Sequence, residues 1–201
     1  WRACLCLRNR YNLMKAADLP TDYNMCEILE NNLKNRSDKT ALCSEYGQFT
    51  FREVSDQVNK VGNALTRLGI GFGECVAILC PDRPEWVSTF FATAKIGGVA
   101  LGMNTMLSTE EYDYIFKDAR VSVLVICENL VSLVEPILSN HKMLTKVIVI
   151  GAKENANYTS FANWINDEET KLEAAQTHRE DFCSLHYSSG TTGMPKGVLH
   201  A

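Results

Sequence analysis

Residues 76–103 read VAILCPDRPEWVSTFFATAKIGGVALGM, and this stretch decides the fold class. The apolar run Val76–Cys80 has the length and continuous hydrophobicity of a buried strand. Pro84 follows it, and because a proline is favoured in the first turn of a helix, a helix is predicted over 85–96. Two glycines end that helix before a second apolar run at 99–103. A strand, a helix and another strand in this order predict a parallel βαβ unit.

The same alternation continues on both sides of this unit. Apolar residues recur every three or four positions over 51–68, which predicts a helix, and Gly69 follows where a left-handed C-cap is expected. Ser108 and Glu111 form a capping-box pattern that predicts a helix to about residue 118. Further strands are predicted at 121–126, 146–150 and 182–187, with a helix over 130–138. The expected fold is therefore α/β, a twisted and mostly parallel sheet flanked by helices.

The remaining segments are less regular. A helix is predicted over 23–35, capped by Thr21 or Asp22, and a small hairpin over 40–51. The other expectations are an irregular arm at 1–20, a polar loop at 151–157, a short helix near 161–165 and an exposed charged run at 167–181. A domain boundary within 151–181 and a long surface excursion both fit this pattern.

Composition excludes several classes of protein. With 201 residues, 46% of them hydrophobic, and a net charge of −4, the chain has too much apolar content to be mainly disordered. No run of 18 apolar residues occurs, so no transmembrane segment is expected. The basic residues are scattered, which argues against a nucleic-acid partner. An intracellular location is expected, either cytoplasmic or mitochondrial, because the acid-free start at 1–15 suits a transit-sequence tail or a linker equally well.

The polar and reactive side chains give no metal or catalytic signature outside one loop. The eight cysteines are expected to be reduced and structural, since no signal peptide is seen and none has metal or redox spacing. His186 precedes the loop and has two interpretations. It is either a polar group near the loop or a strand-end histidine whose hydrogen bonds are made locally, and the second interpretation is favoured. His141 and His178 are expected to be solvated. Core packing is expected for the aromatic residues Trp86, Phe90 and Phe91.

Residues 187–197 read YSSGTTGMPKG and carry the clearest chemistry. Glycines allow close backbone approach to an anion, and Ser and Thr hydroxyls add short-range donors. Lys196 adds a point charge on a flexible stem. The loop therefore predicts a polyphosphate site. It fits neither G-x-x-x-x-G-K-[ST] nor G-x-G-x-x-G, so a Walker A loop and a dinucleotide turn are not indicated. The competing interpretation is an ordinary polar surface loop.

This loop resembles the signature phosphate loop of the adenylate-forming superfamily, which contains acyl- and aryl-CoA synthetases, luciferases and peptide-synthetase adenylation domains. Residues 49–54 (FTFREV) resemble the family's early T-Y-x-E-L segment, and residues 94–100 (AKIGGVA) its A-x-x-A-G-x-V segment. Residues 104–112 (NTMLSTEEY) are most similar to a run found in the benzoate–CoA ligase branch. The resemblance covers about 21–201 and implies the N-terminal part of the large domain of an adenylate-forming enzyme, interrupted after the phosphate loop.

The resemblance also implies roles for the loop. Members attack the α-phosphorus of MgATP with a carboxylate, release pyrophosphate, and then transfer the acyl group to a thiol, usually coenzyme A. The ATP-phosphate residues carried over by position are Ser188, Ser189, Gly190, Thr191, Thr192, Gly193 and Lys196. Hydroxyls and backbone would hold the β- and γ-phosphates, the glycines would permit close approach, and the lysine would balance charge. The implied cofactors and co-substrates are ATP, Mg²⁺ and coenzyme A.

The resemblance implies a piece of an ATP-dependent carboxylate–CoA ligase, with a lean towards aryl, benzoate-like acids. In this family the acyl pocket, the acidic Mg²⁺ residue and the catalytic lysine all follow the loop, so no catalytic residue and no metal ligand is assigned here. The chain alone is expected not to complete adenylation. Three alternatives stay open: a non-catalytic nucleotide-binding module or pseudoenzyme, a structural fragment without a nucleotide site, and a medium-chain fatty acyl-CoA synthetase.

Overall fold

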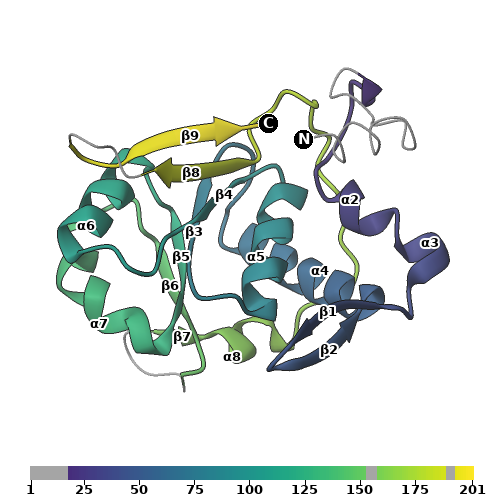
Figure 1. The fold of residues 1–201 in the computed structure, drawn as a ribbon, viewed down its shortest axis with the longest axis horizontal. Helices are drawn as coiled ribbons and strands as arrows, with labels where there is room; N and C mark the ends of the chain where they lie inside the picture. Colours follow the sequence, from purple (N-terminus) through teal and green to yellow (C-terminus); the bar gives the residue numbers. More distant parts are fainter. Residues whose placement is uncertain (1–17, 153–157, 189–192) are drawn as a thin grey trace, which may run out of the picture.

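A computed structural model describes residues 18–152, 158–188 and 193–201. Within these ranges a seven-stranded sheet has the order β7-β6-β5-β3-β4-β8-β9 (Figure 1). All neighbouring strands in it are parallel except β8 and β9. The predicted mostly parallel sheet is thus confirmed. Its strands are β3 (Cys75–Leu79), β4 (Val99–Gly102), β5 (Val123–Cys127), β6 (Lys146–Ile150), β7 (Thr159–Ser160), β8 (Ser184–Ser188) and β9 (Lys196–His200).

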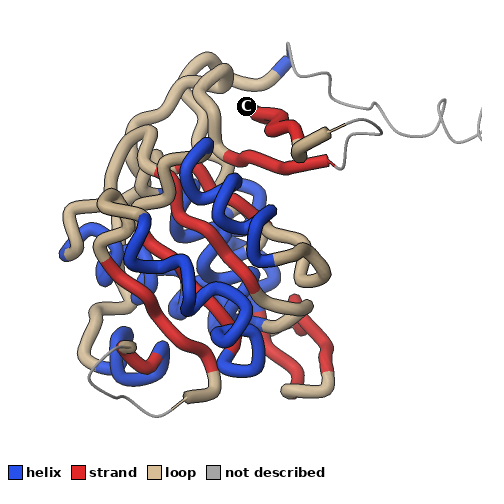
Figure 2. Tube along the Cα trace, turned by 90° about the vertical axis from the view of Figure 1, so that its left-hand side faces the viewer, coloured by secondary structure: helices blue, strands red, loops and turns tan. Residues whose placement is uncertain are grey.

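Helices cover both faces of this sheet (Figures 1 and 2). One face carries α4 (Phe51–Arg67), α5 (Pro84–Lys95) and α8 (Phe161–Asn166), and the other carries α6 (Thr109–Asp118) and α7 (Val131–Val134). Both faces of the central strands are therefore shielded from solvent, and all five residues of β3 and of β5 are buried. This explains why those strands read as continuous apolar runs rather than alternating ones.

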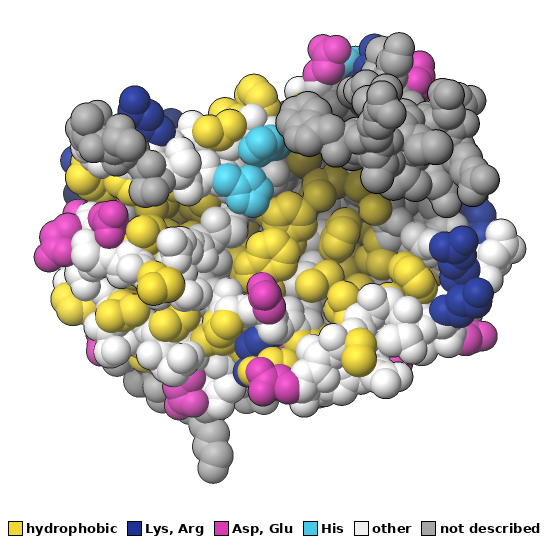
Figure 3. All heavy atoms as spheres, in the orientation of Figure 1, with side chains coloured by type: hydrophobic (Ala, Val, Ile, Leu, Met, Phe, Trp, Pro, Cys, Tyr) yellow, Lys and Arg dark blue, Asp and Glu magenta, His cyan; other side chains and the backbone are white. Residues whose placement is uncertain are grey.

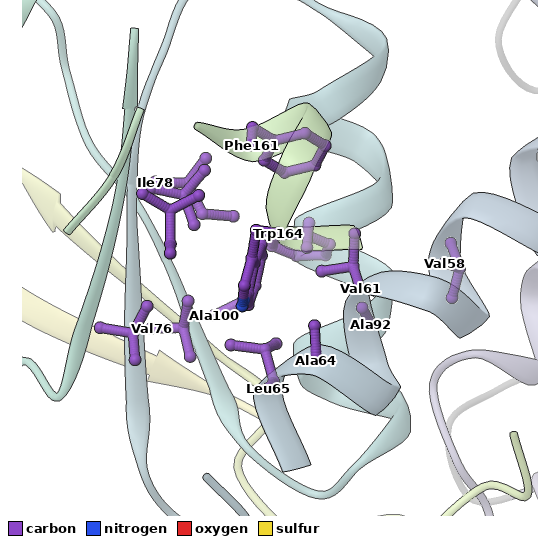
Figure 4. Packing of buried hydrophobic residues seen from close by; sticks show 14 of the residues in the cluster. Val58, Val61, Ala64, Leu65, Val76, Ile78, Ala92, Ala100, Phe161 and Trp164 are labelled. Atoms are coloured by element: carbon purple, nitrogen blue, oxygen red, sulfur yellow. The ribbon is translucent and has the colours of Figure 1, made fainter. Parts of the chain in front are cut away.

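The period of two along each strand divides the core into two clusters. On β3, Val76 and Ile78 face α4, α5 and α8, whereas Ala77 and Leu79 face α6 and α7. Figure 4 shows Ile78 in the first cluster beside Trp164 and Phe161. The expected core role of the aromatic residues on α5 is confirmed, since Phe90 is buried and stacks on Trp86 at 5.0 Å between ring centroids.

The helix predicted over 51–68 and its glycine C-cap are confirmed, and the structure adds an N-terminal capping box that was not predicted. Thr50 accepts a hydrogen bond from the Glu53 backbone N–H, and the Glu53 carboxylate accepts one from the Thr50 backbone N–H. These bonds to Thr50 hold the pKa of Glu53 below its usual range. At the other end, Gly69 has φ +83°, a left-handed conformation in which glycine costs least.

Replacing Thr50 with alanine is expected to lower the free energy of unfolding of this chain by about 1 kcal/mol, because one N-cap acceptor is lost. Urea unfolding followed by circular dichroism measures this loss. Thr66→Ala, near the C-terminal end of the same helix, is the matched control, because its hydroxyl only back-bonds the Gly62 carbonyl. An equal loss in both variants would show that the cap contributes nothing of its own.

The helix predicted over 23–35 is wrong in its start and its continuity. Two single-turn helices are found instead, α2 (Glu27–Glu30) and α3 (Leu33–Arg36), and neither has a side-chain cap. Backbone hydrogen bonds from Arg179 to Thr21 and from Tyr23 to Thr177 hold the preceding residues extended. Tertiary pairing has overridden the local helical pattern. The hairpin predicted at 40–51 is confirmed as β1 (Thr40–Ser44) and β2 (Gly47–Thr50).

The continuous helix predicted over 130–138 is also wrong. The segment forms a 3₁₀ turn (Glu128–Leu130), α7, and a second 3₁₀ stretch (Glu135–Asn140). Pro136 explains the break, because it has no N–H to donate to the preceding turn and its ring crowds that turn. The short helix predicted near 161–165 is confirmed as α8.

The charged run at 167–181 is exposed in part, as expected, and packed in part: Asp167, Glu169 and Lys171 are exposed, whereas its backbone is held by a helix. It lies along α4, where Asn59 and Asn63 donate side-chain hydrogen bonds to the carbonyls of Thr170, Glu169 and Lys171. Glu168 is only 12% exposed and pairs with Arg67 at 2.7 Å. The run is therefore a connection whose backbone packs across α4 while several of its charged side chains stay exposed.

The expected solvent exposure of His141 and His178 is confirmed for one residue and wrong for the other. His141 is not solvated: its side chain is 8% exposed, and Nε2 lies 2.9 Å from the Asp113 carboxylate. His178 is exposed, as expected. The cysteines of the described ranges are free, as expected, although the sulfurs of Cys80 and Cys127 lie 2.9 Å apart at the ends of β3 and β5.

Two stretches that carried expectations fall outside the described residues: positions 1–17 of the arm and 153–157 of the polar loop. In the part of the chain that is described, no helix combines the length and the apolar character that crossing a bilayer requires.

Candidate phosphate-binding site

The predicted phosphate loop connects the two antiparallel strands β8 and β9. Ser188, the last residue of β8, lies opposite Lys196, the first residue of β9. The loop therefore leaves and re-enters the sheet at one cross-strand pair, which places a hydroxyl and an ammonium group side by side. Both residues are exposed. β8 runs parallel to β4 and extends past the carboxyl end of β4. Open α/β sheets bind their ligands at this end of the strands.

The predicted site residues divide into two groups. Ser188, Gly193 and Lys196 are described, and the structure brings Ser188 and Lys196 together. A Cβ built at Gly193 would meet no atom within 4 Å, so open space surrounds that backbone. Four predicted residues lie outside the described ranges: Ser189, Gly190, Thr191 and Thr192. Their assignment to ATP phosphates stays a prediction.

Gly197 is required by packing rather than by backbone conformation. A Cβ there would lie 3.1 Å from Leu185 Cδ1 and 3.1 Å from Tyr187 Cζ, which is closer than ordinary contact. The Tyr187 ring thus lies across the backbone of Gly197, its cross-strand partner. Sequence reasoning treated this glycine only as part of the loop pattern, and its partner on β8 was not anticipated.

Tyr187 also makes the contact that joins the hairpin to a helix. Its hydroxyl donates a hydrogen bond to Oδ2 of Asp118, the last residue of α6, at 2.5 Å. Burial and this carboxylate raise the pKa of Tyr187, so the hydroxyl remains a donor at neutral pH. No sequence signal points to this pair, because 69 positions separate the two residues.

The segment after β4 lies beside the loop. A cavity of about 250 Å³ is lined by residues that include Asn104, Leu107, Ser188 and Pro195. The Tyr112 hydroxyl donates to the Asn104 carbonyl at 2.9 Å, and the Asn104 side chain accepts from the Met106 N–H at 2.9 Å. These bonds order the segment 104–107, which shares the cavity with Ser188 and Pro195 at the two described ends of the predicted phosphate loop.

A larger hollow of about 510 Å³ opens on the other face of the hairpin. Phe90 and Ala94 of α5 contribute apolar lining, and His186 and His200 also line it. Figure 3 shows histidine side chains beside an apolar hollow on this face. The two histidine rings meet edge to face with centroids 5.4 Å apart. His186 is exposed and, by strand alternation, faces away from Tyr187. It therefore belongs to the hollow, on the opposite side from the Asp118 contact.

Metal ligands are not assembled in the part of the chain that is described. No group of three or more His, Cys, Asp or Glu side chains there is arranged to hold an ion. The hairpin presents an exposed hydroxyl, an exposed ammonium group and an open glycine backbone, which are groups suited to contact an anion.

Comparison with known proteins identifies the family. The profile of the AMP-binding enzymes matches residues 29–201, which is most of the chain. The chain belongs to the AMP-binding enzyme family. The family resemblance proposed from the motifs is thereby confirmed, and the matched region includes the β8–β9 hairpin with its predicted phosphate loop.

Two relatives of this chain carry the names of aryl acid–CoA ligases. The chain is 32% identical over 199 residues to a benzoate–CoA ligase of Thauera aromatica, covering 98% of this chain and 37% of that protein. It is 32% identical over 165 residues to a 3-hydroxybenzoate/4-hydroxybenzoate–CoA ligase of the same organism, covering 82% and 32%. The chain therefore spans about a third of the length of these relatives.

A solved structure agrees in fold. The anthranilate–CoA ligase AuaEII, determined with anthranoyl-AMP, matches with a TM-score of 0.91 and 52% identity over 94% of this chain and 36% of that one. A benzoate–CoA ligase from Burkholderia xenovorans matches with a TM-score of 0.78 at 23% identity. The expected α/β architecture of an adenylate-forming N-terminal region is confirmed by these likenesses.

Proposed function

We propose that this chain is the phosphate-binding N-terminal part of an AMP-forming acid–CoA ligase whose substrate is an aryl carboxylic acid. The observation that carries the proposal is the cross-strand pair Ser188–Lys196, which sets a hydroxyl and a cation at the two ends of the loop. Residues 21–201 then form one continuous part of the adenylation domain, with the run at 167–181 packed onto it as a connection.

The proposed reaction has two steps. The substrate carboxylate attacks the α-phosphorus of ATP, the bond to the bridging oxygen breaks, and pyrophosphate leaves as the acyl-adenylate forms. The thiol of coenzyme A then attacks the acyl carbon, and AMP leaves with the electron pair of the broken C–O bond. Lys196 stabilises negative charge on the departing pyrophosphate, and Ser188 donates to a phosphate oxygen.

Mg²⁺ is proposed to arrive bound to ATP. The described residues offer no acidic cluster for it, and the sequence resemblance places the family's acidic ligand beyond the loop. When bound, the ion would neutralise phosphate charge alongside Lys196.

The preference for aryl acids is proposed from the relatives that act on benzoate, hydroxybenzoates and anthranilate. Acid-dependent ATP–pyrophosphate exchange by the whole parent protein tests it, with benzoate, 2-aminobenzoate, 4-hydroxybenzoate and octanoate compared. We expect exchange with at least one aryl acid at a kcat/KM about 100-fold above octanoate.

Other outcomes would overturn the assignment. Preference for octanoate would make the parent a medium-chain fatty acyl-CoA synthetase. ATP binding without exchange for any acid would make it a non-catalytic nucleotide-binding module. The chain of 201 residues by itself is expected to give no exchange, and acid-dependent exchange by it would contradict the assignment of the acyl pocket to later sequence.

A further inference from the structure

We propose that Asp118 and Tyr187 are positioning residues that fix the β8–β9 hairpin, and with it Lys196, in the orientation that receives the phosphates of ATP. The ligand in this proposal rests on the proposed function. The tether itself rests on geometry alone and can be tested without nucleotide.

The parallel pairing of the sheet covers only the first part of β8, and Tyr187 beyond it packs against the core cluster on the α6 face. Pairing between β4 and β8 ends at Gly102 and His186, so Tyr187 and Ser188 extend past the last residue pair with β4. In the sheet, β9 is the edge strand and has β8 as its neighbour. Figure 1 shows the two strands at one end of the fold, with α6 beside them. The contact with Asp118 therefore begins one residue after the support from β4 stops.

The hydrogen bond is short and lies at the surface of the fold. The Tyr187 hydroxyl lies 2.5 Å from Asp118 Oδ2, within the short range typical of a neutral hydroxyl donating to a carboxylate. Tyr187 pairs with Gly197, and the next pair along the hairpin is Ser188 with Lys196. The tether thus acts one residue pair away from the proposed phosphate ligands.

Gly197 is where the Tyr187 side chain contacts the second strand of the hairpin. The ring of Tyr187 lies against its backbone, and a Cβ at that position would come within 3.3 Å of the Tyr187 hydroxyl oxygen. Because Gly197 does not have a positive φ, its backbone conformation does not demand glycine. The ring fixed by Asp118 therefore sits directly on the residue that follows Lys196.

The position of Asp118 supports a role outside its own helix. It is the last residue of α6, where a negative charge faces the negative end of the helix dipole and is unfavourable. Helix stability therefore does not account for an acid at this place, whereas the contact with Tyr187 does.

Two measurements on the same variants test the proposal: Tyr187→Phe, Asp118→Ala, Asp118→Asn and the Tyr187→Phe/Asp118→Ala double variant. Hydrogen exchange of peptides covering 184–200 in this chain, without nucleotide, reports the tether. The KM for MgATP and the kcat of the parent enzyme report positioning. Tyr158→Phe is the matched control, because its hydroxyl also donates to a carboxylate, Glu135 Oε1 at 2.7 Å, far from the hairpin in the sheet order.

We expect Tyr187→Phe and Asp118→Ala each to speed exchange in 184–200 and to raise the KM for MgATP by about 5- to 10-fold, the effect of one hydrogen bond. The kcat is expected to change less than the KM. The double variant should be no worse than either single variant, because both remove the same bond. Asp118→Asn keeps an acceptor oxygen and should retain most of the affinity, and Tyr158→Phe should change neither readout.

Three results would overturn the proposal. Additive effects in the double variant would show that the two side chains do not act through one bond. Faster exchange with an unchanged KM would leave the bond with a merely structural role. Unchanged exchange would show that the bond does not hold the hairpin. If the parent forms no AMP with any acid, the proposed function fails and the ATP part of this proposal with it, while the exchange data still decide the tether.

Discussion

Lys196→Ala is expected to lower the kcat/KM of the parent enzyme for MgATP by about 100-fold or more, the loss typical of removing one preorganised charge from a developing anion. Lys196 starts β9 opposite Ser188, and its side chain is exposed to the space beside the loop. Its charge would act most strongly as pyrophosphate leaves, so kcat should fall as well as affinity. Steady-state kinetics with saturating acid and varied MgATP measures both.

A second lysine controls for the loss of positive charge alone. Lys171 is exposed on the connection across α4, so Lys171→Ala removes the same charge from the surface and should leave kcat/KM within about 2-fold of the original. Equal effects in the two variants would mean that general surface charge, and not the hairpin, governs ATP use. ATP binding that is real but unchanged by Lys196→Ala would remove Lys196 from the proposed site.

Ile78→Ala is expected to cost this chain about 3 kcal/mol of unfolding free energy, because it removes three carbons from a fully buried site. Ile78 lies on β3, the strand between β4 and β5, and its side chain points into the cluster with Trp164 and Phe161 (Figure 4). A loss of this size is a large share of the 5–15 kcal/mol that typical domains have in total.

Urea unfolding followed by tryptophan fluorescence and circular dichroism measures the loss. Val198→Ala on the edge strand β9 is the control, since that side chain is 48% exposed and should cost about 0.5 kcal/mol or less. A loss at Ile78 no larger than that at Val198 would contradict the description of the β3 face as the centre of the core. A change in the slope of the urea dependence would instead point to an altered unfolded state.

The accuracy of the sequence predictions follows the range of the interactions involved. The helix over 51–67 was predicted from its apolar period and the one over 109–118 from its capping box, because each of these patterns lies within a few consecutive residues. The helices expected over 23–35 and 130–138 failed for different reasons. Hydrogen bonds to residues near 177–179 override the first, and the effect of Pro136 on the second was not weighed.

The candidate site divides in the same way. Ser188, Gly193 and Lys196 stand out in the sequence because hydroxyls, glycines and a lysine follow one another in a single loop. The strand β9, which returns the loop to the sheet, was not predicted. The two neighbours of the site, Asp118 and the segment at 104–107, come from distant parts of the chain. Their approach depends on the order of strands in the sheet, which no local pattern encodes.

The sequence by itself determined the α/β class and the family and predicted the position of a phosphate loop, because each depends on periodicity or on consecutive residues. Only the tertiary structure decided that the loop spans an antiparallel edge hairpin, that the run at 167–181 packs on α4, and that Tyr187 is tied to Asp118. The physical reason is that contacts between distant residues form only after the sheet has brought its strands together. Which distant segments meet depends on the whole chain, including the entropy cost of closing the loops between them, and not on any local pattern of residues.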